Sequence, residues 1–381
     1  MSGPLSHQLD GRLQQMVEDL TRKNGIHHAL FAIETGDRSY QQQFVSGAAT
    51  PDGLPMRAET PFFVASISKL FIAVSTLQLV EQGQISLGAP IVDYLPNSVV
   101  SGLHRIDGRD YSDCLTVEHL LRHTSGLPDW LEDRGSASPP LMDRLFTGQD
   151  HRFDIETIAS LVREELTPHF PPQDPGASEP LMRYADTNYQ LLIAIIESVS
   201  GVPLPDVYLT RIFAPLGLRK TWLPERLPAK PGGQEPATVW SGDHPLRLPL
   251  VFASLRDLYS TAADLIHFMR ALIAGSLFEN PGTAGIMYGR FRRFTRFPDP
   301  SALRLPQSPI EYGAGIMRLP LPRLATPGRP TPDLVGHTGA TGTWLFYCRE
   351  FDLYLCGCVD QTAAAPLPFR FVAHVLRAIT Q

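Results

Sequence analysis

Lysine is scarce in this chain, and positive charge does not dominate it. Only four of the 381 residues are lysine, and the 33 basic residues are outnumbered by 39 acidic ones, which gives a formal net charge of −6. Proteins that bind nucleic acid usually carry a surplus of basic side chains. We therefore expect no nucleic-acid partner, and a lysine inside an apolar stretch needs a specific explanation.

Cysteine is also scarce, and long apolar runs are absent. Cys114, Cys348, Cys356 and Cys358 show no C-x-x-C spacing, so they do not predict a zinc or redox site. We interpret Cys356 and Cys358 as small apolar residues on one face of a strand. No stretch reaches about 18 uncharged apolar residues, and the first residues lack the apolar core of a signal peptide. We expect no membrane association and a cytoplasmic location.

The length and the order of the predicted elements indicate two lobes. A single hydrophobic core stops growing near roughly 250–300 residues, and this chain is longer. Strand patterns lie near both ends, at 29–35, 41–47, 341–350 and 351–361. Helical patterns lie between them and at the C-terminus, at 69–83, 116–123, 155–166, 188–201, 261–275 and 368–379.

These patterns predict an α+β or α/β fold in which an antiparallel sheet, built from both termini, is flanked by helices. A mostly helical domain is inserted between its strands. We place the sheet domain at residues 1–90 and 310–381 and the helical domain at 91–309. The active site is expected in the cleft between the two domains.

The stretch VASISKL, residues 64–70, holds one of the four lysines in an apolar run, three residues after a serine. If a helix begins at about Ser66, positions i and i+3 share a face, so the Ser66 hydroxyl and the Lys69 ammonium can meet. A serine becomes nucleophilic when a neighbour takes its proton, and a buried lysine with a lowered pKa can help. The alternative is an N-cap serine beside a lysine that extends to water.

Two further segments carry candidate catalytic groups. In RYADTNYQ, Tyr184 ends a proline-rich loop just before a predicted helix, where a phenol either acts as a general base or simply packs. In GHTGATGTW, the glycines let a substrate approach the backbone, and His337 and Thr338 would lie at the edge of a cleft. The free N–H groups of an edge strand there can stabilise an oxyanion. The alternative is a plain glycine-rich turn.

In this order and spacing, Ser66-Ile-Ser-Lys69, Tyr184-Ala-Asp186 and His337-Thr338-Gly339 resemble the active-site motifs of the penicillin-recognising serine hydrolases, S-x-x-K, Y-x-N and H-T-G. The tyrosine and the H-T-G triplet resemble the branch that contains class C β-lactamases, D-alanyl-D-alanine carboxypeptidases, family VIII esterases, D-amino-acid amidases and nylon-oligomer hydrolases. The resemblance covers roughly residues 20 to 380. It implies a β-lactamase/transpeptidase-like fold and a reaction without a metal or cofactor.

The resemblance also implies a role for each catalytic group. Ser66 would be the acylated nucleophile, Lys69 its proton partner and Tyr184 the base that also serves the leaving group. The backbone N–H groups of Ser66 and Ala340 would form the oxyanion hole. A helix N-terminus at Ser66 fits that role, because free amides and the helix dipole favour negative charge there.

The same resemblance gives His337, Thr338 and Gly339 to contacts with the substrate and the transition state. Asp186 departs from the pattern, since much of the branch has asparagine at this place. A carboxylate only accepts hydrogen bonds and adds charge, whereas an amide also donates. If Asp186 faces Lys69, it should keep that lysine protonated and leave more of the base work to Tyr184. This favours esters or amides that carry a nearby amine over β-lactams or peptides.

The sequence thus predicts a serine hydrolase that acts on small esters or D-amino-acid amides and peptides. The alternatives are a β-lactamase or D-alanyl-D-alanine carboxypeptidase, an acyltransferase of a biosynthetic pathway, and a non-catalytic binding protein on the same scaffold. A metal site at His119 and His123 is disfavoured, because Glu118 precedes the pair instead of lying between its members. We expect His123 instead to bond to the backbone within the loop at 123–130. The arginine cluster at 290–299 is interpreted as a solvated loop that borders the cleft. No pattern indicates an oligomeric state.

Overall fold

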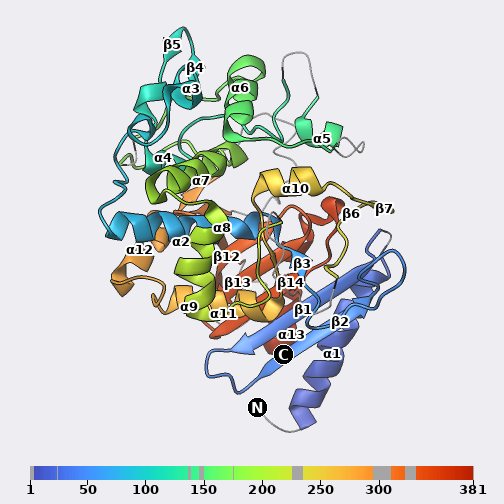
Figure 1. Ribbon diagram of the computed structural model, residues 1–381. Coiled ribbons are helices and arrows are strands. Elements are labelled where there is room, and N and C mark those ends of the chain that lie inside the picture. The colour runs from blue at the N-terminus through green and yellow to red at the C-terminus, as the bar shows by residue number, and fades with distance from the viewer. Residues whose placement is uncertain are drawn as a thin grey trace.

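The computed structural model describes residues 4–23, 25–135, 139–145, 150–174, 176–224, 235–294, 310–321 and 332–380. Its largest feature is an eight-stranded sheet in the order β2-β1-β14-β13-β12-β11-β10-β9 (Figure 1). All of its neighbouring strands are antiparallel. The strands are β1 (His28–Thr35), β2 (Gln41–Gly47), β9 (Arg292–Arg293), β10 (Glu311–Tyr312), β11 (Met317–Pro320), β12 (Asp333–Gly339), β13 (Thr343–Cys348) and β14 (Leu353–Cys358).

The two ends of the chain meet inside this sheet. β1 pairs with β14, with Leu30 opposite Cys358 and Thr35 opposite Leu353. The hairpins β1–β2 and β13–β14 are the two strand pairs that the sequence predicts near its ends. The prediction of an antiparallel sheet built from both termini is confirmed.

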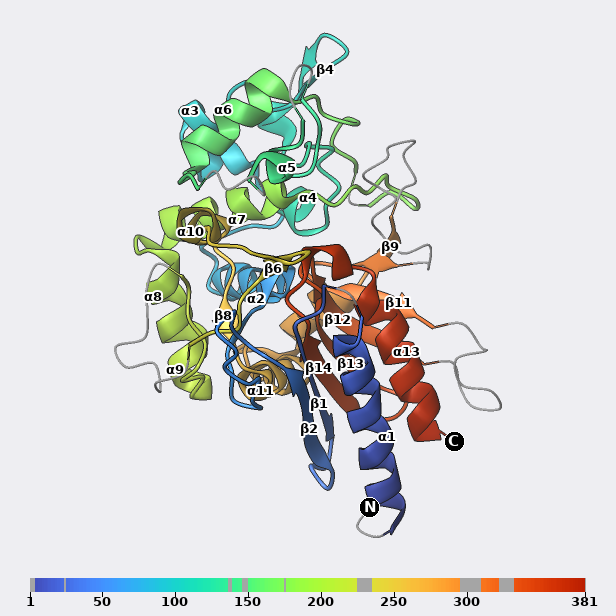
Figure 2. The same cartoon turned by 90° about the vertical axis from the view of Figure 1, so that its right-hand side faces the viewer.

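Alternate residues of the central strands enter two hydrophobic cores. Leu30, Cys356 and Cys358 belong to one core, and Phe31 belongs to the other. Successive side chains of a strand point to opposite faces of the sheet, so helices cover both faces (Figure 2). The predicted place of the two cysteines on one strand face is confirmed. Helices α2 (Ser68–Glu81) and α11 (Ala262–Ile273) lie on the first face, and α1 (Pro4–Thr21) and α13 (Leu367–Thr380) lie on the second.

The chain between β2 and β9 forms most of the helices, and α3, α6 and β4 lie farthest from the sheet (Figures 1 and 2). Besides α2 and α11, the α-helices of this range are α3 (Asn97–Val100), α4 (Val117–Leu121), α5 (Leu141–Leu145), α6 (Ile155–Glu165), α7 (Asp186–Ser200), α8 (Leu204–Tyr208), α9 (Ala214–Leu216), α10 (Pro249–Leu255) and α12 (Ala284–Tyr288). Three short strand pairs join them, β3 (Phe62–Phe63) with β8 (Tyr259–Ser260), β4 (Arg105–Ile106) with β5 (Arg109–Asp110), and β6 (Trp240–Ser241) with β7 (His244–Pro245).

The division into a sheet domain and a helical domain stays a prediction. Strand β9 and helix α11, which contacts β13 and β14, both come from the range 91–309 that we predict to be mostly helical. The arginine cluster at 290–299 also differs from its interpretation as a loop, because Arg292 and Arg293 form β9 and pair with β10. Residues 295–299 of this cluster lie outside the described residues.

None of the described helices is, by itself, long and apolar enough to cross a membrane. The pair formed by Asp186–Ser200 and Leu204–Leu216, bent by 76°, passes such a test by length and composition only.

Candidate active site

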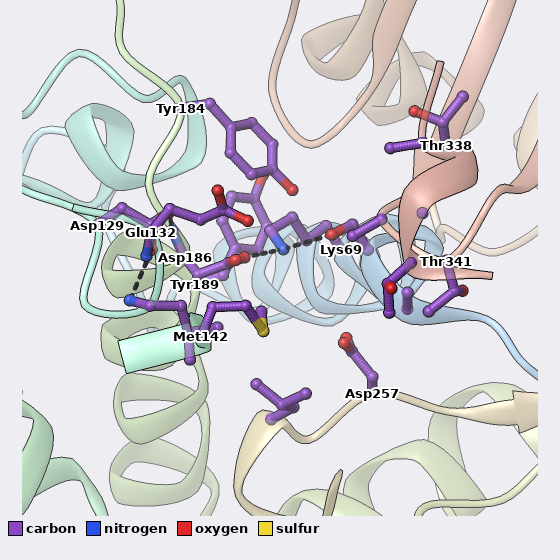
Figure 3. Close-up of a pocket in the computed structure, with 18 of the residues that line it drawn as sticks. Lys69, Asp129, Glu132, Met142, Tyr184, Asp186, Tyr189, Asp257, Thr338 and Thr341 are labelled. Carbon is purple, nitrogen blue, oxygen red and sulfur yellow. Dashed lines mark hydrogen bonds and ion pairs between the residues drawn. The ribbon is translucent and has the colours of Figure 1, made fainter. Parts of the chain in front are cut away.

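A pocket lies where the end of β12 meets the beginnings of α2 and α7 (Figure 3). The loop at 129–133 and the residues from the end of α10 to Asp257 complete its walls. The structure brings seven of the eight predicted site residues into this pocket, and His337 is the exception. The seven are Ser66, Lys69, Tyr184, Asp186, Thr338, Gly339 and Ala340.

Ser66 lies in a short turn that leads into α2. Residues Ala65–Ile67 form a 3-10 turn, and the α-helix begins at Ser68, two residues later than predicted. Ala65 has a φ of +49°, a left-handed conformation that the α-helix excludes, so the regular helix cannot start earlier. Lys69 Nζ still reaches back and donates a hydrogen bond to Ser66 Oγ over 3.2 Å.

Gly339 lets β12 pass close to this turn. A Cβ at Gly339 would lie 2.8 Å from the Val64 carbonyl oxygen, 2.8 Å from Ala65 Cβ and 2.1 Å from Thr343 Oγ1. Atoms overlap at such distances, and only glycine has no Cβ. The close contact between β12 and the turn that carries Ser66 therefore depends on this glycine.

Strand β12 is not an edge strand, which corrects one expectation. It pairs with β13 up to Gly339 and with β11 up to Gly336, which lies opposite Met317. Because β11 begins at Met317, the last residues of β12 extend beyond it and are open on that side. The backbone of Ala340 follows this open end and lines the pocket.

Asp186 lies in the first turn of α7 and forms an ion pair with Lys69. Its own backbone N–H donates to Asp129 Oδ2 over 2.8 Å, which fixes the start of α7 against the 129–133 loop. Burial acts to lower the pKa of Lys69, but Asp186, with smaller contributions from Tyr184 and Asp257, raises it well above its usual value. Lys69 is therefore an ammonium in the free protein, as expected if Asp186 faces it, and it lacks the lowered pKa that would let a buried lysine take the serine proton.

Tyr184 enters the pocket from the side opposite Asp257 (Figure 3). The centre of its ring lies 5.0 Å from Lys69 Nζ. Its hydroxyl is buried and makes no hydrogen bond of normal geometry, although Lys69 and Ser66 lie close enough to act on it. Burial raises the pKa of Tyr184 well above that of a free phenol, although the Lys69 ammonium acts in the other direction. Tyr184 is therefore a neutral phenol in the free protein and not a tyrosinate.

His123 supports this tyrosine, a role that the sequence analysis missed. Its Nδ1 accepts hydrogen bonds from the Ala185 backbone N–H over 3.2 Å and from Asn188 Nδ2 over 3.0 Å. Its ring lies 4.4 Å from that of Tyr184, centre to centre. Burial and the nearby Lys69 lower the pKa of His123 well below its usual value, so the ring stays neutral and keeps an acceptor nitrogen for the Ala185 N–H.

His337 does not line the pocket, although the sequence predicts that it contacts the substrate. Its side chain is fully buried, with Nε2 3.2 Å from the Tyr312 hydroxyl and Nδ1 2.7 Å from the Thr338 carbonyl oxygen. Neighbouring side chains of a strand point to opposite faces, and on β12 Thr338 is the one that faces the pocket. Burial, and to a lesser extent Lys69, lowers the pKa of His337 to about 3. Any effect of His337 on a substrate is therefore indirect.

Potential metal ligands cluster outside this pocket. Of the described histidine, cysteine and acidic side chains, His28, Cys358 and Asp360 form the one group of three whose ligand atoms lie within 4.8 Å of one another. They are buried in the core beside β1 and β14, where His28 Nε2 lies 3.1 Å from Asp360 Oδ2. His119 uses both ring nitrogens in hydrogen bonds, from the Thr116 backbone N–H and with the Gln173 carbonyl oxygen.

The sequence and the fold of this chain match known proteins. A model of the Beta-lactamase family matches residues 13–358. The chain belongs to the Beta-lactamase family. A putative penicillin-binding protein of Bacillus subtilis (strain 168), PbpX, is 31% identical over 228 residues, which are 58% of this chain and 48% of that protein. Esterase EstB of Burkholderia gladioli is 34% identical over 246 residues, which are 61% of this chain and 58% of that protein.

The chain thus spans about half the length of these two relatives. Among solved structures, the D-amino acid amidase from Ochrobactrum anthropi SV3, complexed with L-phenylalanine, superimposes with a TM-score of 0.75. It is 22% identical, and the match covers 98% of each chain. The predicted β-lactamase/transpeptidase-like fold is confirmed.

Proposed function

We propose that this chain is a serine hydrolase that forms an acyl-enzyme on Ser66 and acts on small esters or amides. One observation carries the proposal: Ser66 Oγ accepts a hydrogen bond from Lys69 Nζ inside a pocket that the buried, unpartnered hydroxyl of Tyr184 also reaches. An activated nucleophile needs such neighbours to stabilise its charge and to take its proton. Membership of the Beta-lactamase family supports the same reaction class.

Acylation begins with attack of Ser66 Oγ on the substrate carbonyl carbon, and the proton of the serine passes to Tyr184 Oη. Because Tyr184 is already protonated, it releases its own proton to the leaving alcohol or amine in the same step in which it receives the serine proton, as the bond to that group breaks. The Lys69 ammonium, held by Asp186, stabilises the developing charge on Ser66 Oγ and does not act as the base. Tyr184 thus acts as a proton relay, and no free tyrosinate is required.

Deacylation repeats this transfer with water in place of the serine. Water attacks the acyl carbon and gives a proton to Tyr184 Oη, and the tyrosine returns its own proton to Ser66 Oγ as the ester bond breaks. The backbone N–H groups of Ser66 and Ala340 are proposed to bind the oxyanion in both steps. Both residues line the pocket, and Gly339, which precedes Ala340, passes close to Val64 and Ala65, which precede Ser66.

The charges of the pocket disfavour substrates with a carboxylate next to the scissile bond. Among the described residues, five acidic side chains and two basic side chains line it, and both basic side chains are paired, Lys69 with Asp186 and Arg183 with Asp133. Penicillins and peptides that end in D-alanine carry a carboxylate that needs a cation. We therefore propose neutral or amine-bearing esters and amides, ahead of β-lactams and C-terminal peptides.

A panel of p-nitrophenyl esters and nitrocefin tests this function. We expect the wild type to hydrolyse short-chain esters and Ser66→Ala to lose at least about 10³-fold in kcat, since the acyl-enzyme cannot form. Nitrocefin should be hydrolysed far more slowly than the esters. Ester turnover that survives in Ser66→Ala would reject the proposed nucleophile. Esterified products formed with an added alcohol would instead identify an acyltransferase.

A further inference from the structure

Asp257 lines the pocket but belongs to none of the three motifs that the sequence predicts. It follows α10 directly after Arg256, whose φ of +59° turns the chain in the left-handed region. Its carboxylate projects into the pocket on the side of Lys69 opposite Tyr184 (Figure 3). Non-glycine residues in this conformation carry strain, which concentrates at functional positions. The backbone thus turns sharply just where it presents Asp257 to the nucleophile's pocket.

Among the described residues, no ion pair includes Asp257, which distinguishes it from Asp186. The charged groups that act on it are Lys69 of α2, which attracts it, and Asp186 of α7, which repels it, while the Ser68 hydroxyl bonds to it. Lys69 is already committed to Asp186 and Ser66. A desolvated carboxylate without its own cation is costly, and a cation brought by a ligand removes that cost.

Apolar side chains line the same pocket as this carboxylate. Val251, Phe252 and Leu255 of α10 line the same pocket, and Met142 and Leu145 of α5 add to its apolar lining. Hydrophobic walls with a few placed polar groups are the usual composition of a small-ligand site. The walls fit an apolar side chain on the acyl group, and Asp257 is the polar group placed among them.

We propose that Asp257 binds a protonated amine on the acyl group of the substrate, close to the scissile carbonyl. This inference rests on the proposed function, since it assigns the acyl donor for Ser66. The substrate class is then esters or amides of α-amino acids, or of similar amine-bearing acids, with an apolar side chain. Asp257 selects among substrates and takes no part in the proton transfers.

Three matched methyl esters test the proposal, those of D-phenylalanine, L-phenylalanine and 3-phenylpropionic acid. The third differs from the others only in lacking the amine. The wild type should prefer a phenylalanine ester over the third by about ten- to a hundredfold in kcat/KM, as expected for a charged hydrogen bond. In Asp257→Asn this ratio should fall by about tenfold or more, while Asp257→Glu, which keeps the charge, should restore most of it.

Glu132→Gln is the matched control, because Glu132 also lines the pocket but lies on the Tyr184 side (Figure 3). A ratio that falls in Glu132→Gln and not in Asp257→Asn overturns the assignment to Asp257. A wild type without preference for the amine overturns it as well, and leaves the serine hydrolase intact if all three esters are hydrolysed. If none of the esters is hydrolysed and Ser66 is not labelled by an acylating reagent, the proposed function itself fails.

A pH profile of the wild type tests the same point without a variant. Burial raises the pKa of Asp257 to about 7, against the weaker effect of Lys69. The carboxylate is therefore charged above that pH and neutral below it. The preference for the phenylalanine ester should decline as the pH falls through about 7, relative to the ester without an amine. A ratio that stays constant between about pH 5 and about pH 7.5 would count against the proposal.

Discussion

Two carboxylates act on Lys69 from different elements of the pocket, and they are held in different ways. Asp186 stands in the first turn of α7, bonds to Lys69, and is anchored through its backbone N–H to Asp129. Asp257 follows a left-handed residue after α10 and has no cationic partner among the described side chains. The two residues are of the same type, so their roles differ because of their positions. The paired carboxylate keeps the lysine protonated, and the unpaired carboxylate is proposed to bind the substrate.

The largest expected effect is on kcat, and it comes from Tyr184, which lies on the side of the pocket opposite Asp257. Tyr184→Phe should lower kcat by about 10²–10⁴-fold, the range for loss of a proton-transfer group, and it should do so equally for esters with and without an amine. Its stability should change by less than about 0.5 kcal/mol, since the lost hydroxyl has no hydrogen-bond partner. Steady-state kinetics measures the effect on kcat, and urea unfolding measures the effect on stability.

Full activity in Tyr184→Phe would remove the proposed relay. A change in the preference for the amine would instead show that Tyr184 shares the role given to Asp257, and the contrast between the two walls would disappear.

The second effect is on stability and separates the two carboxylates. Asp186→Ala should lower the free energy of unfolding by about 3 kcal/mol near neutral pH, because it leaves the buried Lys69 ammonium without its partner. Asp257→Ala removes no ion pair and should not destabilise the fold by this amount. Urea unfolding of both variants and of the wild type measures the difference. Equal losses in the two variants would contradict the contrast between a paired and an unpaired carboxylate.

The smallest effect is the pH dependence of stability. The pKa of Asp257 is about 7 in the folded protein, against an ordinary value near 4. Between these values the folded state keeps a proton that the unfolded state has released, so the stability due to this group is lost as the pH rises from about 4 through 7. Asp257→Asn should therefore gain about 1–3 kcal/mol over the wild type between about pH 5 and about pH 8. If the stability difference between Asp257→Asn and the wild type is the same at both pH values, Asp257 does not titrate between them.

The sequence predicts the parts of the fold that depend on local patterns. The hairpins follow from alternation, and the sheet places Leu30 and Phe31 in different cores as that alternation requires. The approach of Lys69 to Ser66 follows from their spacing of three residues, although the left-handed Ala65 delays the helix. The contact of Asp186 with Lys69 is only a condition in the sequence analysis, because no local pattern joins residues so far apart, and the structure supplies it.

Other parts of the site needed the three-dimensional structure. The motif assigns His337 to the substrate, yet the alternation of β12 that turns Thr338 toward the pocket turns His337 into the core. That alternation is visible in the sequence as well. Asp257 had no signal, since nothing near it in the sequence resembles a catalytic motif. His123 is interpreted as bonding to the backbone of its own loop, but its Nδ1 accepts from the Ala185 N–H, a bond that depends on the path of the loop before α7.

The most direct test of the central claim is intact-mass spectrometry of the protein treated with a fluorophosphonate, followed by peptide mapping. We expect one adduct, located on Ser66, in the wild type and in Asp257→Asn, and no adduct in Ser66→Ala. A single adduct on another residue, or an adduct that persists in Ser66→Ala, would contradict it.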